Sequence, residues 1–340
     1  VEPALRARAG SLLDAMNFGF FYDPYDPAHP KLHPGLLHVG CWPDQRAFYG
    51  HYGMLNSEAR IASYLGIARN QLPRDVYFRM YRTLPRRLGP QQQLPSGTTR
   101  EYLGVKVFEG SYLYRGARIV PSWGGSMFEA LMVTLFVPED VWAPRSWGIN
   151  HPLYVDAQIE HGLLEARYGV WGFSPASGPR GGYNVYGVKA LGADPQGYRS
   201  YDLAAQILAP SSRLSGRTNH GVVTPHATFL ALRYRPREAM ANLHTLLSRV
   251  PIYGPLGWHD SVDISAGIVS RVVLAVDQGM IMAAIANELA DNAMQHAFSD
   301  GLVERSIRPL IAMEEFSAGR TEPPGRPLLS LSLLRPAGGE

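Results

Sequence analysis

The sequence predicts an all-α fold, specifically an α/α barrel, and three observations support this prediction. Many segments show helical periodicity, and several of them are apolar on every side, as helices buried among other helices are. Long loops rich in glycine, proline and aromatic residues separate these segments. No repeat period is visible, so an α-solenoid is not expected. An inner ring of apolar helices surrounded by outer amphipathic helices fits all three observations.

The elements follow one another in a simple order. We expect helices at residues 4–16, 53–69, 74–83, 126–137, 151–166, 202–208, 225–233, 237–248, 264–274, 278–297 and 302–314. Loops fill residues 18–52, 84–121, 167–201 and 209–224, with short β ribbons near 101–120. These loops are too aromatic and too poor in charge to be disordered. Long ordered loops are usually functional, and in a barrel they would wall a cleft at one mouth.

Composition limits the function classes. The chain has 340 residues, 46% of them hydrophobic, and no linker-like stretch divides it, so a single domain over residues 1–340 is expected. A net charge of +3 with mixed signs does not favour nucleic acid as a partner. The single Cys41 rules out an internal disulfide. The sequence contains no apolar run of 18 residues, so a membrane-spanning helix is not expected. Residues 1–4 show no signal-peptide pattern, so we expect that a leader or a longer polypeptide preceded them.

Glu129 is the only ionisable residue in the apolar helix predicted at 126–137, for which Ser122 is the expected N-cap. Residues one turn away cannot form an ion pair with it. A carboxyl group in such a place must find a distant partner, hold a proton or do chemistry.

Glu58 lies in a second apolar helix, predicted at 53–69, while Arg60 lies on a different face of that helix. Either Glu58 or Glu129 could instead pair with a distant arginine or cap a backbone. Two carboxyl groups in different environments are what glycoside hydrolysis needs, because one must protonate the leaving oxygen and the other must activate water or attack the sugar.

Aromatic residues alternate with glycines at 168–187, where Trp171, Tyr183 and Tyr186 are candidate stacking platforms for sugar rings, or else pack the loop on itself. Asp260 is expected to face the cleft, whereas Asp263 and Asp277 could each be only a helix cap. His51, His220, His226 and His259 show no H-x-x-x-H spacing with one another, so no metal site is expected. No phosphate loop or dinucleotide fingerprint is present, so no cofactor is expected.

Several short blocks, in order along residues 10–298, resemble the glucoamylase-like family that contains bacterial endo-β-1,2-glucanases and the transglycosylase domain of cyclic β-1,2-glucan synthases. The blocks are YDP at 22–24, SEAR at 57–60, WGGSMFE at 123–129, the aromatic loop at 168–186, GVVTPHA at 221–227, WHD at 258–260 and DQGM at 277–280 followed by IAN at 285–287. Three positions depart from the family pattern. Pro175 stands where synthases have Glu, Ser177 where glucanases have Asp, and His220 where an Asp precedes the glycine.

The resemblance implies an (α/α)6 barrel with a glucan cleft and places Glu58 and Glu129 at the acidic positions tied to catalysis. We expect a glycoside hydrolase acting on β-glucan, with β-1,2-linked glucan as the expected substrate. Another glycan, transglycosylation, or sugar binding without catalysis are the alternatives. Its setting makes Glu129 the expected general acid, with Glu58 as base or nucleophile and Asp260 as a reserve base. Arg60 is expected to orient a carboxylate. The residues expected to bind sugar are Trp123, Trp171, Tyr183, Tyr186, His226, Asp277 and Gln278. By analogy, the family's substrates favour the periplasm or secretion.

Overall fold

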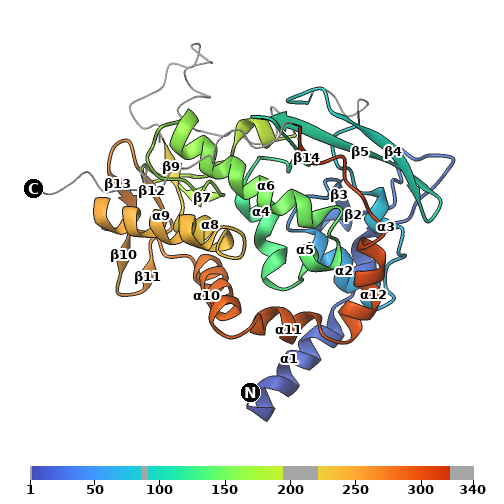
Figure 1. The fold of residues 1–340 in the computed structure, drawn as a ribbon. Helices are drawn as coiled ribbons and strands as arrows, with labels where there is room; N and C mark the ends of the chain where they lie inside the picture. Colours follow the sequence, from blue (N-terminus) through green and yellow to red (C-terminus); the bar gives the residue numbers. More distant parts are fainter. Residues whose placement is uncertain (1, 86–90, 194–220, 322–340) are drawn as a thin grey trace, which may run out of the picture.

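The computed structural model describes residues 2–85, 91–193 and 221–321 (Figure 1). The predicted helix at 202–208 and His220 therefore lie outside the described residues. The helices are α1 (Pro3–Ala15), α2 (Arg60–Ala68), α3 (Val76–Arg79), α4 (Met127–Leu131), α5 (Glu139–Trp142), α6 (Trp147–Glu160), α8 (Pro225–Leu230), α9 (Pro236–Arg249), α10 (Ala275–Leu289), α11 (Ala293–Ser299) and α12 (Leu302–Ile311). One π-helical turn, His161–Glu165, extends α6. Short 3-10 turns lie at Phe18–Phe21, Met132–Leu135 and Lys189–Leu191.

Sheets accompany the many helices, so the prediction of an all-α chain is confirmed only in part. One sheet has the order β14-β6-β5-β4, and its strands are β4 (Ser96–Tyr102), β5 (Val105–Tyr114), β6 (Ala117–Ile119) and β14 (Gly319–Arg320). A second joins β1 (Tyr22–Asp23), β2 (Leu36–Trp42) and β3 (Ala47–His51); a third joins β13 (Ile268–Ser270), β12 (Ser261–Asp263) and β9 (Val222–Val223). Two-stranded ribbons pair β7 (Ala176–Ser177) with β8 (Tyr183–Asn184), and β10 (Tyr253–Gly254) with β11 (Gly257–Trp258). The β ribbons expected near 101–120 are confirmed, whereas the (α/α)6 barrel stays a prediction.

Several predicted helices are wrong in part or altogether. The helix expected at 74–83 is only the short α3, and the one expected at 278–297 is divided into α10 and α11 at residues 290–292. The helix expected at 53–69 begins only at Arg60, so Glu58 lies in the turn before α2. The segment 264–274 forms no helix: β12 and β13 pair as a hairpin, with Val262 opposite Val269. Asp263 is therefore a strand residue and not a helix cap. β-Branched residues, which favour strands, explain why an apolar pattern alone misled here.

Two clusters of buried apolar side chains form the core. One cluster is built around α6, α8, α9 and α10, and the other around α2, α3, α5 and α12. Met132 and Phe136, which follow α4, pack against both clusters. The segment from α4 to residue 136 thus joins the two halves of the core, and the carboxyl group of Glu129 is held at the start of that segment.

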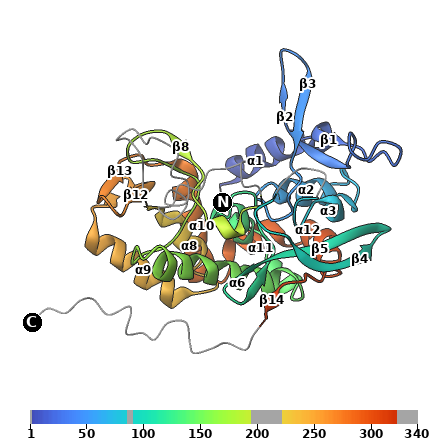
Figure 2. The same ribbon diagram turned by 90° about the horizontal axis from the view of Figure 1, so that it is seen from above.

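The β2–β3 hairpin projects from the body of the molecule (Figure 2). At its base it is fixed by β1, because Tyr22 pairs with Leu37 and Asp23 with Leu36. Among the described helices, none combines the length and the apolarity that crossing a membrane requires.

Candidate active site

A cavity of about 470 Å³ brings together residues from distant parts of the sequence. Four of the predicted site residues lie on its wall, namely the two acids Glu58 and Glu129 and the two aromatic residues Trp123 and Tyr183. The remaining lining residues are Val39, His51, Tyr52, Ser57, Phe128, Pro175 and Val185.

Glu129 is positioned by the start of α4. Ser126, and not Ser122, is the N-cap: its hydroxyl accepts from the Glu129 N–H, and the Glu129 side chain accepts from the Ser126 N–H, which together form a capping box. The preceding loop packs tightly, because a Cβ at Gly125 would lie 2.1 Å from the Val188 carbonyl oxygen, and Gly125 has a φ of +73°. The carboxyl group is thus fixed by backbone that only glycine allows.

The two carboxyl oxygens of Glu129 have different surroundings. Oε2 accepts from the hydroxyls of Ser126 at 2.7 Å and Ser122 at 2.8 Å, and from the backbone N–H groups of Ser126 and Gly124, each at 3.1 Å. Among the described residues, Oε1 accepts only from Gly124 N, at 3.0 Å. Burial raises the pKa of Glu129; the Ser126 hydrogen bond lowers it, and the nearby Glu58 raises it, and the net direction is upward. Oε1 is therefore the oxygen better placed to carry a proton.

Glu58 is more open than Glu129. It is half-buried in the turn before α2, and its Oε2 accepts from the Ser57 hydroxyl at 3.1 Å. Ser57 and Glu58 both line the cavity. The site therefore pairs one fully enclosed carboxyl group with one that solvent can reach.

The predicted stacking residues divide into two groups. Trp123 is half-buried at the cavity, and Tyr183 on β8 is 61% exposed there. Trp171 and Tyr186, by contrast, are packed inside the core cluster around α6 and are each 1% exposed. The prediction that Trp171 and Tyr186 are platforms for sugar does not fit this burial, since their ring faces are already covered by protein.

Arg60 does orient a carboxylate, but that carboxylate is Glu139. Its Nε donates to Glu139 Oε1 at 2.7 Å and its Nη2 to Oε2 at 2.8 Å, and both side chains are fully buried. Arg60 also donates to the backbone carbonyls of Glu129 and Ala130. Through these bonds Arg60 holds the start of α4 in place. It does not line the cavity, so a direct contact between Arg60 and the substrate is not supported.

Sequence reasoning missed His51, which reaches the cavity from β3. Its Nε2 lies 2.8 Å from Asp23 Oδ2, and Asp23 Oδ1 lies 2.8 Å from His33 Nδ1. Burial raises the pKa of Asp23, but the hydrogen bonds with His33 and His51 outweigh it and hold the pKa below its usual value. The YDP block at 22–24 was the available signal, because Asp23 is the residue that fixes His51.

Three other predicted site residues gather away from the cavity wall. His226 on α8, Asp260 before β12 and Asp277 on α10 offer ligand-type atoms that all lie within 4.8 Å of one another. Asp260, expected to face the cleft, is only 1% exposed; its Oδ2 accepts from Ser177 N at 2.6 Å. Burial and the charge on Asp260 raise the pKa of Asp277 to about 8.

Gln278 has a structural role next to this cluster. Its side-chain amide donates to the Trp258 carbonyl oxygen at 2.9 Å and accepts from Trp258 N at 3.2 Å. This paired contact ties α10 to β11. The amide is used by the backbone, so substrate binding by Gln278 is not supported.

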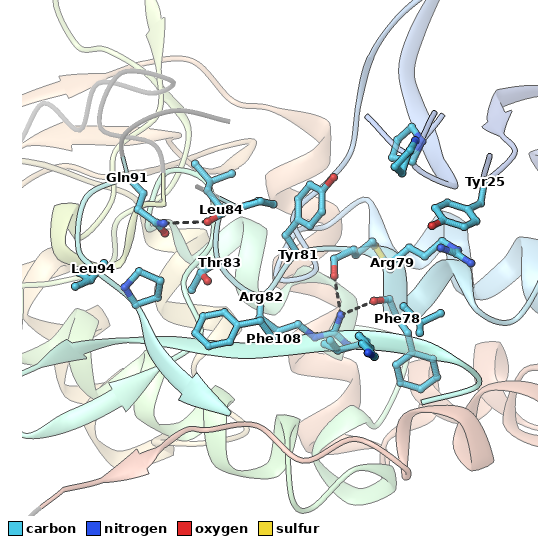
Figure 3. A pocket seen from close by; sticks show the side chains of 18 residues that line it. Tyr25, Phe78, Arg79, Tyr81, Arg82, Thr83, Leu84, Gln91, Leu94 and Phe108 are labelled. Carbon is cyan, nitrogen blue, oxygen red and sulfur yellow. Dashed lines mark hydrogen bonds between the residues drawn. The ribbon is translucent and has the colours of Figure 1, made fainter. Parts of the chain in front are cut away.

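A second cavity, of about 450 Å³, is lined by the end of α3, the segment that follows it and the first residues of β5 (Figure 3). None of the predicted site residues lines it. Two of its three charged members are engaged elsewhere: Arg82 donates to Glu314 and to the Met80 carbonyl oxygen, and Arg79 pairs with Asp75. We therefore place the candidate chemistry in the cavity that holds Glu58 and Glu129.

Known proteins resemble this chain over most of its length. Residues 102–300 match the family described as “Putative glucoamylase”. The cyclic β-(1,2)-glucan synthase NdvB of Rhizobium meliloti is 29% identical over 318 residues, which are 88% of this chain but 9% of that protein.

Two solved structures share the fold. The endo-β-1,2-glucanase of Chitinophaga pinensis, solved with sophorotriose and glucose, has a TM-score of 0.54 and 16% identity. A “putative glucoamylase” of Bacteroides fragilis has a TM-score of 0.56 and 17% identity. The likeness covers 90% of this chain and 64% and 63% of those two chains, respectively.

Proposed function

The chain belongs to the family described as “Putative glucoamylase”, and on that premise we propose that it is a glycosidase that cleaves β-glucan, with β-1,2-linked glucan as the preferred substrate. Membership confirms the resemblance found in the short sequence blocks. The proposed substrate is inferred by analogy, since one relative is named as a β-(1,2)-glucan synthase and one fold neighbour as an endo-β-1,2-glucanase.

The observation that carries the proposal is the pair of carboxyl groups on one cavity. Glu129 is enclosed and Glu58 is open to solvent, with Trp123 and Tyr183 beside them. Different surroundings for two carboxyl groups are what separates the acid from its partner in glycoside hydrolysis.

In the proposed reaction Glu129 donates its proton from Oε1 to the glycosidic oxygen as the bond from that oxygen to the anomeric carbon breaks. Glu58 either takes a proton from the attacking water or attacks the anomeric carbon itself, in which case water then releases the sugar and returns the proton to Glu129. If a second sugar hydroxyl replaced water, the same residues would perform transglycosylation.

The test is product release from linear β-1,2-, β-1,3- and β-1,4-glucans by the wild-type protein, Glu129→Gln and Glu58→Gln. Glu101→Gln, on an exposed strand position, is the matched control. We expect sophoro-oligosaccharides from the β-1,2-glucan, a loss of about 10²-fold or more in both cavity variants, and no change in the control.

Pro175 on the cavity wall favours a second candidate, which is the same chemistry on a different glycan, because synthases carry Glu at this position. If the protein cleaves another glycan and Glu129→Gln abolishes that cleavage, the substrate assignment would change while the proposed mechanism would stand. Sugar binding without turnover on any substrate would contradict the assignment as an enzyme and would leave Glu129 with its capping role alone.

A further inference from the structure

The cluster of His226, Asp260 and Asp277 lies between elements that are far apart in the sequence. The three residues come from α8, from the segment before β12 and from the first turn of α10, and none is more than 4% exposed. They form a closed site beside the active-site cavity and take no part in the proposed hydrolysis.

Three atoms of this cluster have no hydrogen-bond partner in the described part of the chain: His226 Nδ1, Asp260 Oδ1 and Asp277 Oδ2. Buried polar atoms are almost always paired, so three such atoms in one place need an explanation. His226 Nδ1 lies 3.4 Å from Asp277 Oδ1, which is longer than the usual N–H···O distance of about 2.7–3.2 Å. The carboxyl groups of Asp260 and Asp277 also lie within hydrogen-bond reach of each other, so both carboxyl groups and the His226 ring crowd around one point.

Distance and charge both fit a cation at that point. Ligand atoms held about 2.0–2.2 Å from a tetrahedral metal ion lie roughly 3.4 Å apart, which is the separation of His226 Nδ1 and Asp277 Oδ1. Within the described residues, no cationic side chain is hydrogen-bonded to these two buried carboxyl groups, so a divalent positive charge would also stabilise them.

We propose that His226, Asp260 and Asp277 bind a divalent transition-metal ion of the zinc or manganese type. One imidazole nitrogen and two carboxylate oxygens are a donor set that suits these ions, whereas calcium prefers oxygen ligands alone. The ion ties α8 to α10 and fixes Asp260, which holds Ser177 N in β7. It is therefore a structural ion that supports the wall on which Pro175 lies, and the proposal does not depend on the glycosidase assignment.

The other group of metal-type residues, Asp23, His38 and His51, is a weaker candidate. Asp23 is already hydrogen-bonded with His33 and His51, and His38 Nδ1 with the Gly50 carbonyl oxygen. This group serves as an internal comparison in the test.

The experiment is metal binding by the full chain after treatment with a chelator and dialysis. Zn²⁺, Mn²⁺ and Ca²⁺ are added separately, bound metal is measured by plasma mass spectrometry, and Tm is measured by scanning fluorimetry. We expect one equivalent of Zn²⁺ or Mn²⁺ per chain, a rise in Tm of about 2 °C or more, and a much weaker response to Ca²⁺.

Asp277→Asn and His226→Gln should lose this equivalent and the rise in Tm, while Asp23→Asn and the exposed Asp300→Asn should keep both. Circular dichroism identifies any variant that fails to fold, and the wild-type stoichiometry decides the proposal without variants. Absence of bound metal and of a Tm shift in the wild-type protein would overturn it. Retention of the metal in folded Asp277→Asn, or its loss only in Asp23→Asn, would overturn it as well.

Discussion

The two carboxyl groups of the cavity differ in how many donors they meet. Oε2 of Glu129 is surrounded by hydroxyl and N–H donors, while Glu58 accepts one hydrogen bond from its neighbour Ser57. Donors to a carboxylate stabilise the charged form, and burial opposes them. The protonation of Glu129 thus depends on a balance that single substitutions can shift.

Ser126→Ala removes the hydroxyl that donates to Glu129 Oε2 at 2.7 Å and also removes the N-cap of α4. With that donor gone the pKa of Glu129 rises further. A general acid works while protonated, so the alkaline limb of the kcat/KM profile should move to higher pH. The lost cap should also reduce the free energy of unfolding by about 1 kcal/mol. The measurements are the pH profile and urea unfolding.

Ser248→Ala, at an exposed serine that bonds only to the Thr245 carbonyl oxygen, is the control. A limb that stays in place in Ser126→Ala, in a folded and active variant, would show that Glu129 does not act as the acid.

Arg60 and Glu139 provide a test of stability at the same scale. Arg60→Met leaves Glu139 buried without its cationic partner, which should lower the free energy of unfolding by about 3–5 kcal/mol. The double variant Arg60→Met/Glu139→Met should lose less than the sum of the single variants, because neither charge is then left alone. Chemical denaturation of the four proteins measures this coupling. Additive losses would contradict the role of the pair.

At the scale of elements, the β2–β3 hairpin extends the cavity outward. Val39 and His51 near its base line the cavity, while Trp42 nearer its tip is 54% exposed and stacks on Tyr49 with ring centroids 5.0 Å apart. Gly40 lies beneath the Tyr49 ring, where a side chain would clash. The hairpin therefore carries an exposed, stacked aromatic pair beyond the residues that line the cavity.

Trp42→Ala should leave the fold intact and raise KM for long glucan chains by about 2- to 10-fold, the range that one aromatic contact contributes. Short oligosaccharides that fill only the cavity should be cleaved as before. Leu256→Ala, at another exposed apolar residue, is the matched control. Equal effects on long and short substrates would show that the hairpin does not contact the chain.

At the scale of the whole molecule, buried ion pairs hold the two halves of the core together. Glu139 on α5 bonds with Arg60 on α2, with Tyr64 and with His151 on α6. Burial raises the pKa of Glu139, but Arg60 outweighs it and lowers the pKa to about 2. This network makes stability depend on pH.

Glu139 stays charged in the folded protein down to about pH 2, whereas in the unfolded chain it takes up a proton near pH 4.5. Its contribution to stability is therefore complete above pH 4.5 and is lost as the pH falls toward 2. The difference in unfolding free energy between the wild-type protein and Glu139→Gln should be largest near pH 7 and shrink below pH 4.5. Urea titrations at several pH values measure it, and a difference independent of pH would refute this.

Local patterns foresaw part of the fold. Helical periodicity found α6, α8, α9, α10 and α12, and alternation found the ribbon of β4 and β5. It failed at 264–274, where strand-forming residues pair across a turn, and at 53–58, where the chain turns before α2. Both segments are apolar enough to be buried, and apolar patterning alone does not separate a short strand or turn from a helix.

The sequence predicted the two acidic residues of the candidate site but not most of the residues around them. The sequence by itself determined that Glu58 and Glu129 stand in apolar segments, and a capping box, S-x-x-E at 126–129, was there to be noticed. Only the tertiary structure decided that both face one cavity, that Trp171 and Tyr186 are buried, and that Arg60 serves Glu139. It also brought His226, Asp260 and Asp277 together. These are contacts between residues many positions apart, and spacing along a chain carries no information about which distant side chains meet.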